Sequence, residues 1–180
     1  MNFHIHTSHR FNHMCILTPT KINHSKKSIV RIPKIILTGE GSFTKNTEYF
    51  TSNLSYIEKL QKKQYSIDLK RQHVRSVWIG TFLYSRLVLA RSLWLIIYTK
   101  QSYLTKELFK ISIGKSFIRY ESDIQKRIDE LCYGYNQFTN KSYTHIAPIW
   151  LKKYTLHYKG KYYVTIQEIF SYSTIDYLIR

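Results

Sequence analysis

A carboxylate lies within an apolar pattern near the end of the chain. In the run Tyr162–Phe170, alternate side chains of a β-strand point to the same face. On that basis Glu168 shares a face with three apolar residues, Val164, Ile166 and Phe170. A carboxylate there is costly unless it is paired, hydrogen-bonded or protonated, so Glu168 is a candidate functional-site residue. The alternative is a flipped or twisted strand on which Glu168 meets a surface lysine.

An arginine has a similar position earlier in the chain. Arg75 shares the alternating face of the run His73–Ile79 with Val77 and Ile79. Because a guanidinium is not neutralised in proteins, a buried one requires an anion. Arg75 is therefore a candidate for binding an anion. The alternative is a side chain at a strand end that extends to water.

Metal chemistry has weaker support in the sequence. Four histidines lie near the N-terminus, with no cluster of carboxylates or cysteines to complete a ligand set: His4, His6, His9 and His13. That composition favours a solvated tail over a metal site. Cys15 and Cys132 lack metal-ligand spacing and do not form a disulfide framework, which favours a reducing compartment. We expect no bound metal.

The elements that must position Arg75 and Glu168 are hairpins. Two β-rich runs flank Lys159 and Gly160, a turn signal typical of a hairpin. The run His73–Ile79 and the run Leu87–Trp94 predict a second hairpin, because both are rich in β-branched and aromatic residues. Strand pairs of this kind predict an antiparallel sheet.

Two helices are predicted beside the strands. Ser42 follows a Gly-x-Gly turn and is a suitable N-cap for a helix through Phe43, Thr47 and Phe50. Between Lys115 and Tyr133, apolar residues recur with helical spacing and predict an amphipathic helix: Phe117, Ile124, Ile128 and Leu131. We therefore expect a single α+β domain over residues 35–180, preceded by a weakly structured basic arm over residues 1–34.

Composition narrows the classes of function. The 180 residues carry 28 Lys and Arg against 11 Asp and Glu, a net charge of +17. The basic residues are scattered, and the heavy use of Lys, Ile, Asn and Tyr is typical of A+T-rich coding in an organelle, so we do not expect a nucleic-acid partner. The longest apolar run, Leu93–Tyr98, is too short to span a bilayer. With 43% hydrophobic residues the chain should fold as a soluble protein.

Six segments, in this order, resemble the chorismate lyase (chorismate pyruvate-lyase) superfamily: Leu37–Lys45, Arg75–Ile79, Leu89–Ser92, Ser112–Gly114, Ile149–Lys153 and Gly160–Phe170. The resemblance covers about residues 35 to 178. Within the superfamily, the chain is most similar to plastid-encoded members from red-algal-type chloroplasts. The resemblance implies a stromal protein of the chloroplast. It also implies a single-domain antiparallel sheet with helices covering an internal ligand cavity.

The resemblance also implies a reaction and a set of site residues. Family enzymes convert chorismate to 4-hydroxybenzoate, a quinone precursor, and pyruvate without a metal or organic cofactor. By position in the motifs, the carboxylate-binding arginine corresponds to Arg75, and the carboxylate near the ligand hydroxyl corresponds to Glu168. Backbone contacts to the ligand correspond to Phe43 and Ile113, and Arg91 corresponds to an arginine near the cavity. We expect a monomer.

The chain departs from the family pattern at three places. Ser112 replaces a proline before the Ile-Gly pair, Ser171 and Tyr172 stand where a proline follows the last strand, and Lys152 ends a Trp-Gly-Arg-type segment. None removes a proposed catalytic side chain, but each bears on the shape of the pocket. Two alternatives therefore stay open beside a lyase: a basic organellar protein that binds an aromatic acid without turnover, and one that binds nucleic acid or an acidic partner.

Overall fold

The structure is a computed structural model that describes residues 11–17, 36–39, 41–67, 70–83, 86–96, 113, 124–136, 149–158, 161–171 and 174. Its elements are strands β1 (Phe11–Leu17), β2 (Ser55–Ile67), β3 (Lys70–Thr81), β4 (Val88–Ile96), β5 (Ile124–Asn136), β6 (Ile149–Tyr158) and β7 (Lys161–Ser171), with helix α3 (Phe43–Thr51) before β2. A short helical turn also covers residues 36–38.

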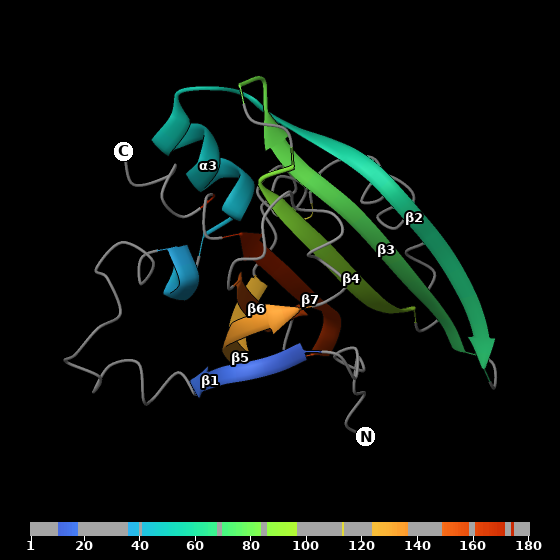
Figure 1. The fold of residues 1–180 in the computed structure, drawn as a ribbon. Coiled ribbons are helices and arrows are strands. Elements are labelled where there is room, and N and C mark those ends of the chain that lie inside the picture. Colours follow the sequence, from blue (N-terminus) through green and yellow to red (C-terminus); the bar gives the residue numbers. More distant parts are fainter. Residues whose placement is uncertain are drawn as a thin grey trace.

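The strands form one antiparallel sheet in the order β1-β5-β6-β7-β4-β3-β2, which twists strongly from β5 to β2 (Figure 1). Both predicted hairpins are confirmed, as β3 pairs with β4 and β6 pairs with β7. The two hairpins are joined by pairing of β4 with β7. This long-range pairing places β4 between the strand that carries Arg75 and the strand that carries Glu168.

The predicted helix from Lys115 to Tyr133 is wrong where the structure describes it, because Ile124–Asn136 is strand β5. The register of β5 against β6 shifts between Ile128 and Glu130, which marks a β-bulge. A bulge inserts one residue, so the inward-facing apolar positions are Ile124, Ile128 and Leu131, with spacings of four and three. Those are also the spacings of one helix face. The first part of the predicted helix lies outside the described residues.

Part of the predicted N-terminal arm lies within the described residues. Residues Phe11–Leu17 form β1, which pairs with β5 at one edge of the sheet. The rest of residues 1–34 lies outside the described part of the chain. The boundary between the arm and the domain at residue 35 stays a prediction.

Helix α3 begins where it was predicted, with Ser42 as N-cap. The backbone carbonyl of Ser42 accepts the first helical hydrogen bond from Asn46, at 3.0 Å. The Ser42 hydroxyl is hydrogen-bonded to the Thr44 hydroxyl instead of capping the backbone. The Phe43 ring packs edge-to-face against Phe170 of β7, with centroids 5.2 Å apart, so the helix start is anchored on the sheet.

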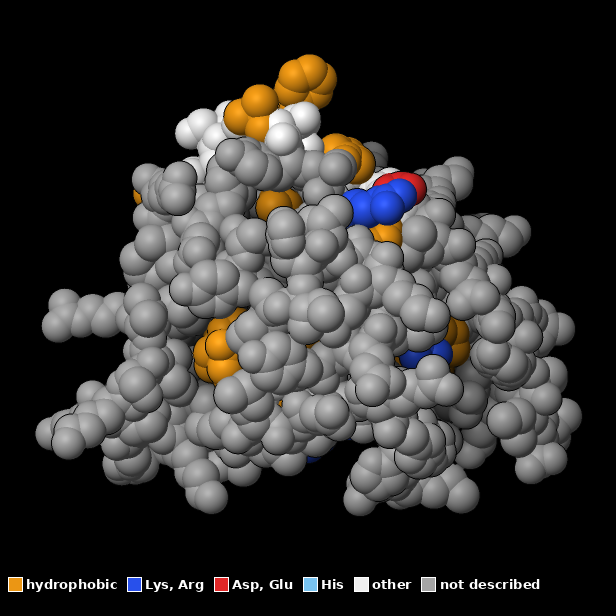
Figure 2. Space-filling view, in the orientation of Figure 1, with side chains coloured by type: hydrophobic (Ala, Val, Ile, Leu, Met, Phe, Trp, Pro, Cys, Tyr) orange, Lys and Arg blue, Asp and Glu red, His pale blue; other side chains and the backbone are white. Residues whose placement is uncertain are grey.

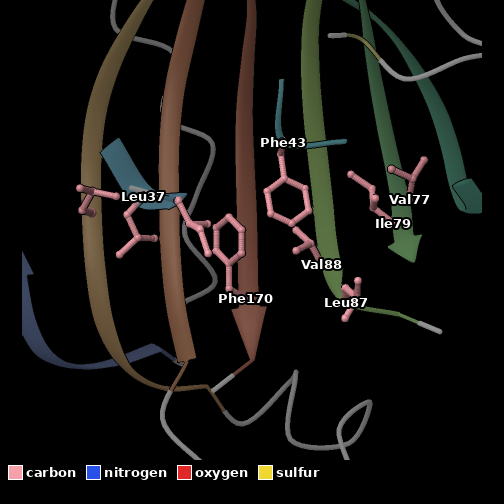
Figure 3. Close-up of a cluster of buried hydrophobic side chains, with 9 residues drawn as sticks. Leu37, Phe43, Val77, Ile79, Leu87, Val88 and Phe170 are labelled. Atoms are coloured by element: carbon pink, nitrogen blue, oxygen red, sulfur yellow. The ribbon is translucent and has the colours of Figure 1, made fainter. Parts of the chain in front are cut away.

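The main hydrophobic core lies between this helix start, the turn at residues 36–38 and the face of the sheet. Figure 3 shows Phe43 above Phe170 and Val88, with Leu37 over the β5–β6 side and Val77 over β3. A second buried cluster continues along the same face and includes Trp94, Tyr154 and Ile166. A single domain built on an antiparallel sheet is thus confirmed, while helices that cover a cavity remain a prediction.

The described surface has one apolar region near the end of α3. Large exposed side chains gather there and in the adjoining ends of β2 and β3: Tyr49, Phe50, Leu54, Tyr56, Phe82 and Leu83. Figure 2 shows separate orange side chains in its upper part, near the blue and red atoms of an exposed ion pair, and Arg86 and Glu58 form such an exposed pair. Among the described residues, no helix has the length and hydrophobicity needed to span a bilayer.

Candidate functional site

A cavity of about 240 Å³ lies on the inner face of the sheet. It is lined by the residues before and at the start of α3 and by side chains from β2 to β7: Gly41, Ser42, Phe43, Thr44, Ile57, Arg75, Val77, Ile79, Ala90, Ser92, Ile113, Lys126, Tyr154, Leu156, Ile166 and Glu168. An apolar cavity of about 150 Å³ accommodates benzene, so this one has room for a substituted ring.

The space exists because the central strand carries small residues at this point. On the inner face of β4, Ala90 and Ser92 lie between the bulkier Val88 and Trp94, both of which are buried. Side chains alternate along a strand, so these four residues form one row. The Trp94 indole donates a hydrogen bond to the Ser92 hydroxyl at 2.9 Å, which fixes one end of the cavity floor.

Arg75 and Glu168 both line this cavity, and each is only 4% exposed. Ser92 lies opposite Arg75 on β3, and Ala90 lies opposite Glu168 on β7. With two strand spacings across and two residues along, their Cα atoms are about 12 Å apart. The two side chains can therefore bind opposite ends of a small molecule that lies across β4.

Burial sets the chemistry of Arg75. Desolvation lowers its pKa from the usual value, but a guanidinium still remains protonated at physiological pH. A permanent cation in an apolar cavity attracts an anion strongly, because water screens the charge poorly there. A planar carboxylate fits the guanidinium best.

Glu168 is oriented by a neighbouring tyrosine. The Tyr154 hydroxyl donates a hydrogen bond to Glu168 Oε1 at 2.9 Å. Desolvation raises the pKa of Tyr154 well above its usual value, and the negative charge of Glu168 and this hydrogen bond raise it further. Tyr154 thus stays protonated and remains a donor, which holds the Glu168 carboxylate in one orientation at the cavity wall.

A buried lysine faces Glu168 on the next strand. Lys152 lies opposite Glu168 in the β6–β7 register and is 2% exposed. Its Nζ donates to the carbonyls of Ile36 and Gly39 at 3.3 and 3.2 Å. Desolvation lowers the pKa of Lys152 to about 7, although the negative charge of Glu168 opposes that shift. Near neutral pH this group can therefore exist in either protonation state.

A second lysine reaches the cavity from β5. The Lys126 Nζ donates to the carbonyls of Gly39 and Gly41 at 2.9 and 3.3 Å. It also lies 4.4 Å from the centroid of the Tyr154 ring, within the range of a cation–π interaction. Lys126 and Lys152 therefore both tie the segment that precedes α3 to the sheet.

Sequence reasoning missed Lys126, Lys152 and Tyr154 as site residues. Alternation along Ile149–Tyr158 places Lys152 and Tyr154 on one face, and the hairpin register sets Lys152 against Glu168. That signal was present in the sequence. Lys126 was missed because its segment was predicted to be a helix, and on that helix Lys126 lies on the polar face.

Of the other predicted site residues, two line the cavity and one does not. Phe43 and Ile113 both line the cavity, close to the positions expected of them. Arg91 does not, which corrects the expectation that it lies near the cavity. It is exposed, and its neighbours Ala90 and Ser92 face the cavity, so alternation turns the Arg91 side chain to the other face of β4.

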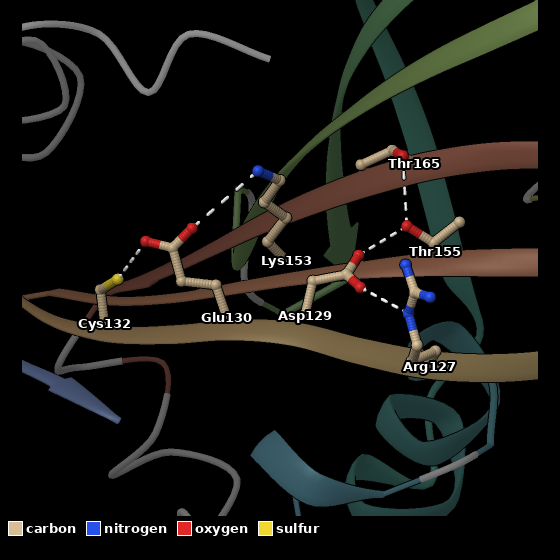
Figure 4. A network of polar contacts seen from close by, with 7 residues as sticks. All are labelled: Arg127, Asp129, Glu130, Cys132, Lys153, Thr155 and Thr165. Carbon is tan, nitrogen blue, oxygen red and sulfur yellow. Dashed lines mark hydrogen bonds and ion pairs between the residues drawn. The ribbon is translucent and has the colours of Figure 1, made fainter. Parts of the chain in front are cut away.

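A polar network occupies the opposite face of the sheet (Figure 4). Asp129, in the bulge of β5, accepts hydrogen bonds from Thr155 and from Arg127. Glu130 accepts one from the Cys132 thiol and lies 3.9 Å from Lys153. These contacts satisfy the polar groups at the bulge and so maintain the register that brings Lys126 to the cavity.

No group of three His, Cys, Asp or Glu that could hold a metal ion is found within the described ranges. The side chains of the four N-terminal histidines lie outside those ranges. The polar groups of the cavity are instead cations, hydroxyls and one carboxylate, a set suited to an organic anion.

Residues 37–178 match a protein family described as "Chorismate pyruvate-lyase Rv2949c-like". The chain belongs to this family. It is 39% identical over 150 residues to the "Uncharacterized protein ycf21" of Porphyra purpurea, covering 80% of this chain and 83% of that protein. It is 33% identical over 165 residues to ycf21 of Antithamnion sp., covering 88% and 91%. These relatives are encoded in red-algal plastids.

Among solved structures, the chain is similar to a "putative GntR-family transcriptional regulator", with 8% identity and a TM-score of 0.47. The likeness covers 67% of this chain and 56% of that one.

Proposed function

We propose that this protein is a chorismate lyase that converts chorismate to 4-hydroxybenzoate and pyruvate in the plastid stroma, as a monomer without metal or organic cofactor. The observation that supports the proposal is the placement of Arg75 and Glu168 in one cavity of the size of a substituted ring. Membership of the chorismate pyruvate-lyase family points to the same ligand class.

Each side chain has a role in this chemistry. Arg75 binds the ring carboxylate of chorismate, and Glu168 accepts a hydrogen bond from the ring hydroxyl at the other end. During reaction the bond between the ring and the enolpyruvyl oxygen breaks, and the hydroxyl-bearing carbon loses its proton, so the ring becomes aromatic. In this proposal Glu168 accepts that proton, which is supported by the hydrogen bond through which Tyr154 holds its carboxylate in one orientation. The released enolpyruvate takes up a proton to give pyruvate.

Positioning of the substrate accounts for the rest of the rate acceleration. Aromatisation provides the driving force, so the protein needs to hold the ring in a reactive geometry and exclude water. The apolar walls serve this purpose, with Val77, Ile79, Leu156 and Ile166 around the ring. In the family fold, helices cover such a cavity, and the described helical residues of its lining are those at the start of α3 and Ile113.

The test is a chorismate assay that follows 4-hydroxybenzoate and pyruvate in equal amounts. Arg75→Lys keeps the charge but loses the planar fork, so binding of 4-hydroxybenzoate should weaken by about ten-fold or more. Glu168→Gln should lower turnover by roughly a hundred-fold with a smaller effect on product affinity. Arg91→Ala is the matched control, since Arg91 faces away from the cavity and should change neither quantity.

The same assay separates the alternatives. Binding of 4-hydroxybenzoate through Arg75 without formation of pyruvate would indicate a carrier or sensor of aromatic acids in place of an enzyme. If the wild-type protein neither binds 4-hydroxybenzoate nor consumes chorismate, the lyase proposal is wrong.

A further inference from the structure

We infer that Lys126 recognises a second carboxylate of the ligand, at the side of the cavity away from Arg75, so that the site selects a dianion over a monoanion. This inference rests on the proposed function, because it concerns the substrate class of the same cavity.

The positions of the two cations support it. Arg75 enters the cavity from β3 and Lys126 from β5, with β4, β7 and β6 between them in the sheet. Glu168 and Tyr154 lie on these intervening strands. Across the cavity, the Arg75 guanidinium therefore comes first, then the Glu168 carboxylate with Tyr154, and then the Lys126 ammonium.

The position of Lys126 is fixed on the protein side. Its Nζ contacts the carbonyls of Gly39 and Gly41, and it lies over the Tyr154 ring, whose hydroxyl reaches Glu168. Gly41 itself lines the cavity. The ammonium is thus held beside the part of the cavity where Glu168 meets the ligand hydroxyl.

The substrate has the matching arrangement. In chorismate the ring carboxylate and the hydroxyl are at opposite ends of the ring, and the enolpyruvyl ether is on the carbon next to the hydroxyl. A ring held by Arg75 at one end and Glu168 at the other carries its second carboxylate on the Glu168 side. That is the side from which Lys126 enters.

Charge balance agrees with a dianion. The described lining residues include two cations, Arg75 and Lys126, and one carboxylate, Glu168, with Lys152 directly behind it. When Lys152 is protonated, three cations stand against one carboxylate, and a dianion compensates the excess positive charge whereas a monoanion compensates only half of it. Substrate and product also differ in charge, because 4-hydroxybenzoate has lost the carboxylate that Lys126 recognises. The same contact therefore favours substrate over product.

Two unreactive probes measure the contribution of the second carboxylate to binding. One is 4-hydroxybenzoate, and the other is 3-(carboxymethoxy)-4-hydroxybenzoate, which adds a carboxylate on an ether next to the hydroxyl. We expect the wild-type protein to bind the diacid at least about ten-fold more tightly by calorimetry, a difference typical of one charge-assisted contact. The preference should decrease as salt is added, because part of it is electrostatic.

Lys126→Gln removes the charge but keeps donors for the two glycine carbonyls, so it is the variant least disruptive to the fold. It should bind both probes with affinities within about two-fold of each other, and Lys126→Arg should restore the preference. Lys153→Gln is the matched control on β6, since Lys153 belongs to the network on the opposite face and should retain the wild-type preference.

The outcomes separate this inference from the lyase proposal. Equal wild-type affinity for the two probes overturns the inference even if chorismate is consumed, and so does an unchanged preference in Lys126→Gln. A preference that depends on Lys126, without release of pyruvate from chorismate, supports the inference and contradicts the lyase activity. If the wild-type protein binds neither probe, the inference is wrong, and if it also consumes no chorismate, the lyase proposal is wrong as well.

Discussion

A larger side chain on the floor of the cavity should stabilise the protein and weaken ligand binding. Ala90 lies at the centre of the floor, between Val77 on β3 and Glu168 on β7. Ala90→Ile adds three carbon atoms, each contributing about 0.8 kcal/mol when buried, and loses about 0.5–1 kcal/mol of side-chain entropy. An isoleucine also suits a strand. The expected gain is about 1 to 2 kcal/mol in the free energy of unfolding.

Urea unfolding with an unchanged m-value measures that gain, and calorimetry with 4-hydroxybenzoate measures the loss of binding. Because the ring must lie over Ala90 to reach both Arg75 and Glu168, affinity should fall by at least about ten-fold. Arg91→Ile is the matched control, since the next residue on the strand is exposed on the other face and offers no cavity to fill. A destabilised Ala90→Ile protein would refute the cavity, because overpacking a filled core costs about 1–3 kcal/mol. Unchanged ligand affinity would refute the binding position.

Two further predictions concern stability. Burial lowers the pKa of Lys152 to about 7, below its value in the unfolded chain, so the folded state binds fewer protons and is stabilised as pH rises from 7. The unfolding free energy of the wild type relative to Lys152→Met should therefore increase by about 3 kcal/mol from pH 7 to pH 10, and a difference independent of pH contradicts it. Deletion of residues 1–17 removes β1 and exposes the edge of β5, so it should lower the thermal midpoint by more than about 5 °C, whereas deletion of residues 1–10 leaves it within about 3 °C. Equal effects of the two deletions would show that β1 adds nothing to the sheet.

Much of the sheet could be predicted because its strands alternate and its hairpins are local. Alternation alone placed Arg75 and Glu168 on inner faces, and turn residues paired the strands that carry them with their sequence neighbours. The pairing of β4 with β7 has no local signal, since about seventy residues separate those strands. The expectation that Arg75 and Glu168 contact the same ligand therefore depended on the family resemblance.

The error in β5 has a physical cause that also hid a site residue. A bulge at Asp129 converts strand spacing into helical spacing for Ile124, Ile128 and Leu131. Asp129 reinforced the helical interpretation, because an acid in the middle of a strand is uncommon unless it is held by other groups. Here the Thr155 hydroxyl and the Arg127 guanidinium hold it. Reading the segment as a helix turned Lys126 to solvent and removed it from consideration.

The cavity arises as much from small residues as from charged ones. Ala90 and Ser92 replace core-sized side chains in the row between Val88 and Trp94, and that choice forgoes apolar contacts that a bulkier residue would make. Arg75, Lys152 and Glu168, each at most 4% exposed, add desolvation costs on the same face. A sheet optimised for stability alone would carry neither feature. Both weaken the fold at the one place where a bound anion restores contacts and charge balance, so we expect ligand binding and stability to be coupled through the inner face of β4.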